Sequence, residues 1–223
     1  MNFNIKNKKE IIVIATSVVA FAVSYYLVKN YATKKGRLKN IANKDLRKWE
    51  GKTETDSSRS SDLVSYWKLV GKDFSNKQMQ QRSTHSSYPW SAVYISHLIK
   101  KAGYKNFNPA TTHSAYVVSA KKNRVNKLKD SYWAYKPNEL QGVEIGDILI
   151  KGRAGTNPSL DTINSGVLSH GDIVVDLATV DGQKYAITQG GNVSNTVKQT
   201  KVALTDDYRL LNPVHFAQLK YEK

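Results

Sequence analysis

Apolar positions follow a helical period in the first half of the chain and a strand period in the second. Spacings of three and four predict a helix across residues 61–71, with Ser61 as a candidate N-cap. They predict a second helix across 90–102, ended by Gly103, and a third across about 112–121. We therefore expect the amino-terminal part of the domain to be helical.

Short β-type runs follow at 148–151, 172–177, 184–189 and 196–204. Asp181-Gly182 lies between two of these runs and is typical of a tight hairpin turn. Helices followed by antiparallel strands predict an α+β domain, with the amino-terminal helices packed on a small antiparallel sheet.

One apolar run precedes this domain. Residues 11–28 carry no charge, and 18 residues at about 1.5 Å each just cross a bilayer core. Ala20-Phe21-Ala22 has the spacing of a signal-peptide cleavage site, and a buried core helix is the third interpretation. The run continues to Val28 and is flanked by lysines, which favours a single transmembrane anchor. The predicted organisation is a basic tail (1–10), an anchor (11–28), a flexible basic and polar stem (29–58) and the α+β domain (59–223).

Charge is concentrated next to this run. The chain has 34 Lys and Arg against 18 Asp and Glu, and residues 1–48 hold 11 of the basic and 2 of the acidic residues. Basic residues are denser after the run than before it, so the positive-inside rule favours a cytoplasmic domain. The sequence of the domain shows neither a basic stripe nor a recognisable nucleic-acid-binding motif, which argues against nucleic acid as a partner.

The chain has no cysteine. This excludes disulfide frameworks, cysteine-bound zinc and a thiolate nucleophile, so covalent catalysis would need oxygen or nitrogen. No cofactor is expected.

Three positions have the residue types of a nucleophilic site. Ser91 stands at a predicted helix start, where backbone amides favour a developing anion. The alternative is that Ser91 is an N-cap or a small residue of helix packing. His170 stands at the mouth of a strand, as a base or a structural histidine. Gln189 and Asn192 end the next strand, where either one could orient His170.

Four further residues have two interpretations each. His113 completes the site or is a core histidine, and Trp90 stacks on sugar or packs in the core. Arg153 binds a substrate carboxylate or is a surface residue. Asp172 faces the same side of its strand as His170, so it supports a neighbouring base, or joins His113 and His170 in a metal site.

Five ordered motifs resemble a bacterial family known only as a domain of unknown function, itself similar to the CHAP and NlpC-type amidases and peptidases. They are Pro89-Trp90-Ser91-Ala92 through Ile95-Ser96, His113-Ser114-Ala115-Tyr116-Val117, Gly146-Asp147-Ile148-Leu149 with Arg153, Ser169-His170-Gly171-Asp172-Ile173-Val174-Val175, and Gly190-Gly191-Asn192-Val193-Ser194-Asn195. The resemblance spans roughly residues 60–219. It implies a papain-like fold with Ser91 in the cysteine nucleophile position, His170 as base, and Asn192 or Gln189 as the orienting residue.

The resemblance implies a membrane-anchored hydrolase of peptidoglycan or a related envelope polymer, with the domain on the extracytoplasmic side. This location conflicts with the distribution of basic residues. The serine in place of cysteine favours an alternative, a catalytically inactive papain-like module that binds cell wall or a protein partner, in a phage particle or secretion apparatus. A metal-dependent hydrolase using His113, His170 and Asp172 is the third interpretation.

Overall fold

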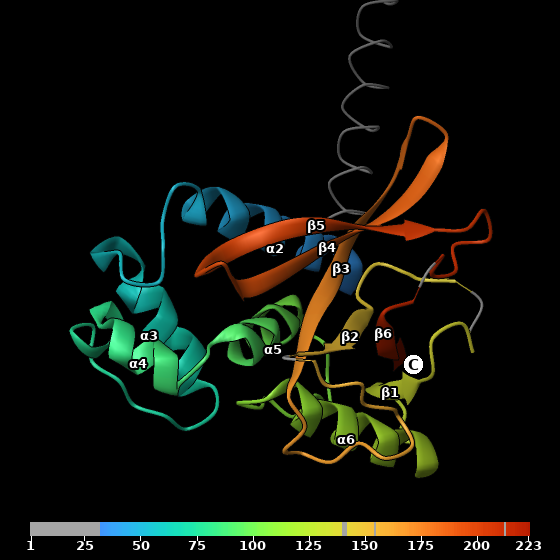
Figure 1. The fold of residues 1–223 in the computed structure, drawn as a ribbon, viewed down its shortest axis with the longest axis horizontal. Coiled ribbons are helices and arrows are strands. Elements are labelled where there is room, and N and C mark those ends of the chain that lie inside the picture. The colour runs from blue at the N-terminus through green and yellow to red at the C-terminus, as the bar shows by residue number, and fades with distance from the viewer. Residues whose placement is uncertain (1–31, 140–141, 154, 212) are drawn as a thin grey trace, which may run out of the picture.

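The computed structural model describes residues 32–139, 142–153, 155–211 and 213–223. This part of the chain is an α+β domain with five α-helices and a six-stranded antiparallel sheet, as the sequence predicted (Figure 1). The helices are α2 (Lys34–Trp49), α3 (Ser60–Lys68), α4 (Arg82–Ser87), α5 (Ser91–Ala102) and α6 (His113–Val125). The strands are β1 (Ser131–Tyr135), β2 (Ile148–Gly152), β3 (Ser169–Val180), β4 (Gln183–Val193), β5 (Thr196–Leu204) and β6 (His215–Glu222).

The sheet has the order β1-β6-β2-β3-β4-β5, and each neighbouring pair is antiparallel. Asp181 and Gly182 join β3 to β4 with φ of 50° and 80°. Positive φ at both central residues is the requirement of a type I′ hairpin turn, so the predicted turn is confirmed. Strand β5 has the predicted bounds, whereas β1 and β6 were not predicted.

Helix α5 is the central helix. It contacts α2 and α3 as well as β3 and β4, and Figure 1 shows it between α3 and the sheet. All its residues except Lys100 and Lys101 are buried. The helix ends at Gly103 (φ 82°), where a left-handed residue is required, which confirms the predicted end. The first residue of this helix is Ser91.

Helix α2 corrects the prediction of a flexible stem across 29–58. Leu38, Ala42 and Trp49 are fully buried, and Trp49 stacks on Trp90 with ring centroids 4.9 Å apart. These apolar positions recur at helical spacing, but the many lysines and arginines between them obscured the pattern. The folded unit therefore begins before residue 59.

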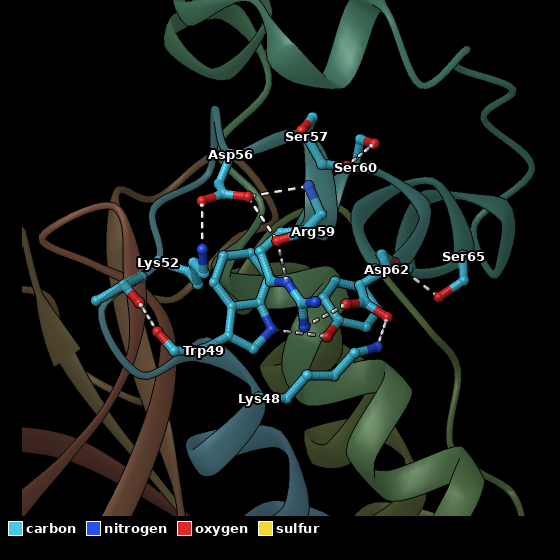
Figure 2. A network of polar contacts seen from close by, with 12 residues as sticks. Lys48, Trp49, Lys52, Asp56, Ser57, Arg59, Ser60, Asp62 and Ser65 are labelled. Atoms are coloured by element: carbon cyan, nitrogen blue, oxygen red, sulfur yellow. Dashed lines mark hydrogen bonds and ion pairs between the residues drawn. The ribbon is translucent and has the colours of Figure 1, made fainter.

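A polar network ties the end of α2 to α3 (Figure 2). Asp62 of α3 forms ion pairs with Lys48 of α2 and, at 3.3 Å, with Arg59. Asp56 accepts from Lys52 at 3.2 Å and caps the short 3₁₀ turn that precedes α3. This network holds the two helices in one unit.

The segment expected to end the flexible stem is also bound to the domain. Glu54 is 6% exposed, and its carboxylate accepts from the indole N–H of Trp90 at 2.8 Å. Its backbone N–H donates to Asn195 O at 2.8 Å. Buried polar groups with such partners fix the backbone, so residues 53–58 belong to the fold.

In the described part of the chain, no helix is long and apolar enough to cross a membrane. The tail predicted for 1–10 and the anchor predicted for 11–28 lie outside the described residues.

Candidate functional site

Ser91 is the first residue of α5 and is 4% exposed. The first backbone bond of the helix runs from Tyr94 N–H to Trp90 O, at 3.0 Å, and the N-cap Trp90 offers no side-chain acceptor. The amides of the first turn therefore have no partner within the helix and add to the positive end of its dipole. A negative charge that developed beside Ser91 would be stabilised here.

The hydroxyl of Ser91 faces His170, which lies near the start of β3. Ser91 Oγ is 3.3 Å from His170 Nδ1, and His170 Nε2 is 2.9 Å from Asp172 Oδ1. The side chain of His170 is 14% exposed. Serine, imidazole and carboxylate therefore form one continuous line of hydrogen bonds, the arrangement of a nucleophile with an oriented base.

The tautomer of a neutral His170 ring follows from its hydrogen-bond partners. A carboxylate only accepts hydrogen bonds, so the proton of a neutral His170 ring lies on Nε2 and points at Asp172. Nδ1 then presents a lone pair to Ser91 and can accept the hydroxyl proton. The two ring nitrogens have exchanged the roles that they have in the chymotrypsin triad, but the order of groups is the same.

A second imidazole contacts the same hydroxyl. His113, the first residue of α6, places Nε2 at 2.9 Å from Ser91 Oγ, and its Nδ1 is hydrogen-bonded to the hydroxyl of Tyr116. Burial lowers the pKa of His113 well below 6.5, and positive charge on His170 or Arg153 lowers it further. His113 is thus a buried histidine, as one interpretation held, but it bonds to Ser91 and Tyr116.

Two glycines make room for these side chains. A Cβ on Gly190 of β4 would overlap Asp172 Oδ1, and a Cβ on Gly171 of β3 would lie within 3.0 Å of both His113 Nδ1 and the Tyr116 hydroxyl. Neither glycine has a positive φ, so the close approach, and not the backbone conformation, requires glycine here.

The family match extends over the fold that carries this site. A model of bacterial uncharacterized conserved proteins, DUF2272, matches residues 47–221. The chain belongs to this family. No curated protein and no solved structure matches the chain. The expectation of a family of unknown function is confirmed, and the likeness to cell-wall amidases and peptidases stays a prediction.

In this DUF2272 domain Gln189 does not approach His170. Its side chain is completely buried, where Nε2 donates to Ala42 O at 2.9 Å and to the Tyr94 hydroxyl at 2.6 Å. Its Oε1 accepts from Gln199 Nε2 at 2.9 Å. These bonds tie α2, α5, β4 and β5 together, so Gln189 has a structural position.

Asn192 is the other residue expected to orient His170. It is half-buried with a left-handed backbone (φ 57°), and no hydrogen bond joins it to His170 in the described structure. His170 Nε2 is instead hydrogen-bonded to Asp172, the residue that the sequence left open as a supporting carboxylate. Trp90 is fully buried against Trp49, which places it in the core and away from a sugar-binding surface.

Arg153 and Lys151 lie on the rim of the site. Lys151 is paired with His170 across β2 and β3, and Arg153 N–H donates to Leu168 O at 3.2 Å one step further along. Neither side chain has an ion pair with any described residue. Arg153 is exposed, yet close enough for its charge to affect His113.

The metal-site interpretation finds no support in the donor geometry. Within the described ranges, no three His, Asp or Glu side chains are grouped as they would be around a metal ion. His113 and His170 each direct one ring nitrogen at Ser91 and the other at Tyr116 or Asp172.

Tyr116 and His215 also belong to the surroundings of the site. The sequence gave Tyr116 no role there and indicated a structural histidine at position 215. Tyr116 follows His113 by three residues, a spacing that places both on one helix face, so the signal was present. His215 of β6 pairs with Lys151 across the sheet. Burial lowers its pKa to about 4, with Lys151 acting in the same direction. Only the sheet order brings it here, which the sequence did not reveal.

Proposed function

We propose that this protein is a serine-dependent hydrolase of amide bonds, with Ser91 as nucleophile, His170 as general base and Asp172 as the orienting carboxylate. The observation that carries the proposal is the hydrogen-bonded line from Ser91 Oγ through both nitrogens of His170 to Asp172 Oδ1. A serine hydroxyl is a weak nucleophile without an adjacent, oriented base, and this geometry supplies one.

The chemistry follows the positions of the atoms. Ser91 Oγ would attack the carbonyl carbon of the substrate while its proton passes to His170 Nδ1, and Asp172 would stabilise the resulting imidazolium. The free amides at the start of α5 would stabilise the oxyanion. His170 would then return the proton to the leaving amine. Water would cleave the acyl-serine by the same route, which regenerates Ser91.

The proposed substrate is peptidoglycan or a related envelope polymer, and the proposed fold is papain-like. The resemblance of the five motifs to cell-wall amidases and peptidases supports both. Lys151 and Arg153 support an acidic substrate, because a peptide carboxylate bound at the rim would pair with cations that have no ion pair among the described residues. Arg153 is thus the proposed carboxylate-binding residue.

The test is covalent labelling of the full-length protein in detergent micelles with a fluorophosphonate, followed by digestion of purified peptidoglycan. We expect labelling and release of new amino groups with the wild type, and neither with Ser91→Ala or His170→Ala. Ser96→Ala is the matched control, because Ser96 lies on the same helix with its hydroxyl bonded to Ala92 O. Circular dichroism must show that all variants fold.

A second candidate function is a non-catalytic module that binds the polymer or a protein partner. It is favoured by one observation: Ser91 is only 4% exposed, and neither of two surface hollows on the domain is lined by it. Polymer that is pulled down by the wild type without labelling or release would contradict the hydrolase and support this module.

We also propose a single-pass anchor at residues 11–28, with the domain outside the cytoplasmic membrane next to its polymer. The chain has no cysteine, so Lys198→Cys on exposed β5 would introduce a unique thiol. A membrane-impermeant maleimide should label this variant on intact cells. Labelling only after lysis would place the domain inside and agree with the distribution of basic residues.

A further inference from the structure

The proposed proton transfers do not involve His113 or Tyr116, although His113 contacts the proposed nucleophile. We propose that His113 is a positioning residue, which Tyr116 holds in the tautomer that carries its proton on Nε2. The Nε2–H group donates to Ser91 Oγ and so directs the Ser91 proton to His170. This inference rests on the proposed function, since it assigns the direction of each proton in the same site.

The count of protons around Ser91 supports this direction. A hydroxyl donates one hydrogen bond and accepts up to two. His170 Nδ1 carries no proton when Nε2 donates to Asp172, so the contact at 3.3 Å needs the proton of Ser91. That proton is then used. The contact at 2.9 Å between Ser91 Oγ and His113 Nε2 must therefore be donated by His113.

Tyr116 completes the line. With its proton on Nε2, a neutral His113 presents a lone pair at Nδ1, and the atom that faces this lone pair is the Tyr116 hydroxyl. Burial raises the pKa of Tyr116 well above 10, so this phenol keeps its proton and donates it. Along the line of hydrogen bonds from Tyr116 through His113, Ser91 and His170 to Asp172, each contact then joins one donor proton to one acceptor lone pair.

The surroundings keep His113 in one charge state. It is 4% exposed, and burial lowers its pKa well below 6.5. Positive charge on His170 or Arg153 lowers this pKa further. A neutral His113 that took the opposite tautomer would draw the serine proton toward itself and away from the base that Asp172 supports.

Helix α6 and strand β3 hold His113 and Tyr116 rigidly. His113 and Tyr116 are three residues apart on α6, whose first turn is capped by Thr112. Gly171, next to His170 on β3, allows the helix face to approach. A change in the angle of α6 would therefore alter the bond between His113 and Ser91.

The first test is a direct measurement of the tautomers. Long-range ¹H–¹⁵N correlation spectra of the full-length, ¹⁵N-histidine-labelled protein distinguish a proton on Nδ1 from one on Nε2, and the chain has 5 histidines to assign. We expect a neutral Nε2–H ring for His113 at pH 7, and the Nε2–H tautomer for the neutral form of His170. Tyr116→Phe should remove the preference of His113 alone. A proton on His113 Nδ1 in the wild type would overturn the inference.

The second test is the rate of fluorophosphonate labelling of Ser91. His113→Leu should slow labelling about tenfold to a hundredfold, the worth of one buried hydrogen bond to a reacting group, with the fold intact. His113→Gln keeps an N–H donor and should recover part of the rate. Equal rates for the wild type and His113→Leu would overturn the inference. A wild type that is not labelled would overturn the nucleophile itself, while the spectra still decide the direction of the protons.

Discussion

His170 and Asp172 are two residues apart on β3, and His170 Nε2 lies 2.9 Å from Asp172 Oδ1. A strand places residues i and i+2 on one face, so the proposed base and its carboxylate come from the same short segment of backbone. Their relative position needs no contact between distant parts of the chain.

Asp172→Asn should decrease the rate of Ser91 labelling by about 10³–10⁴-fold, because an amide does not stabilise the imidazolium and permits the wrong tautomer of His170. Asn192→Ala is the matched control and should stay within about twofold of the wild type, since no described hydrogen bond joins Asn192 to His170. Rates measured with a fluorophosphonate decide between them. The opposite ranking would return the orienting role to Asn192.

Gly190→Ala should inactivate the site while the rest of the domain keeps its fold. The added Cβ overlaps Asp172 Oδ1, so the carboxylate must leave His170. Gly166→Ala is the control, because its Cβ meets only Asn164 Oδ1 at 3.4 Å and the backbone has no positive φ. Labelling rates should fall at least tenfold for Gly190→Ala alone, and unchanged rates would show that Asp172 does not support His170.

Ser91→Cys should contain a thiol with a pKa well below the ordinary value of about 8.5, because His170 and the start of α5 stabilise the thiolate. The chain has no other cysteine, so alkylation by iodoacetamide at a series of pH values reports this thiol alone. His170→Gln in the same background should raise the midpoint toward 8.5. A midpoint above 8.5 with His170 present would exclude an activating environment.

Gln189→Ala should destabilise the domain by about 2–4 kcal/mol, since two buried partners and the half-buried Gln199 lose a hydrogen bond when the side chain is removed. The pH profile of labelling should keep its shape in conditions where the variant is folded. Urea unfolding measures the first quantity. A variant of unchanged stability but reduced labelling would indicate that Gln189 acts on His170 after all.

Asp45→Asn should stabilise the protein at pH 7 by about 3 kcal/mol and leave its stability almost unchanged at pH 3. Burial raises the pKa of Asp45 from 3.8 to about 6, only partly opposed by Lys101. The unfolded chain therefore releases this proton near pH 4 and the folded chain near pH 6, so the contribution of Asp45 to stability declines between them. Exposed Asp206→Asn is the control, with no change expected at either pH, and urea unfolding measures both variants.

Local patterns predicted the parts of the fold that depend on neighbouring residues. The end of α5 at Gly103, the turn at Asp181-Gly182 and the bounds of β5 all follow from short-range rules. Strand β1 pairs with β6, some 90 residues later in the chain. Such pairings depend on the whole sheet, which explains why these two strands were not predicted.

The candidate site was predicted only in part, because short-range rules again give some of its contacts and not others. Period-two alternation placed Asp172 beside His170 from sequence alone, and the helix start at Ser91 was also predicted. The contact between Ser91 and His113 joins two separate helices, and no spacing rule gives the angle between them. The expectation of Asn192 beside His170 came from the resemblance, whereas the described hydrogen bond of His170 Nε2 is to Asp172.

The packing of α2 determines how far the site could extend from a membrane. A flexible stem of some 30 residues would give a reach of about 30 Å, enough to sample a thick layer of polymer. With α2 fixed to the domain, only residues 29–33 separate the proposed anchor from Lys34, and five residues span at most about 17 Å. An anchored enzyme with such a short linker would act on polymer close to the bilayer.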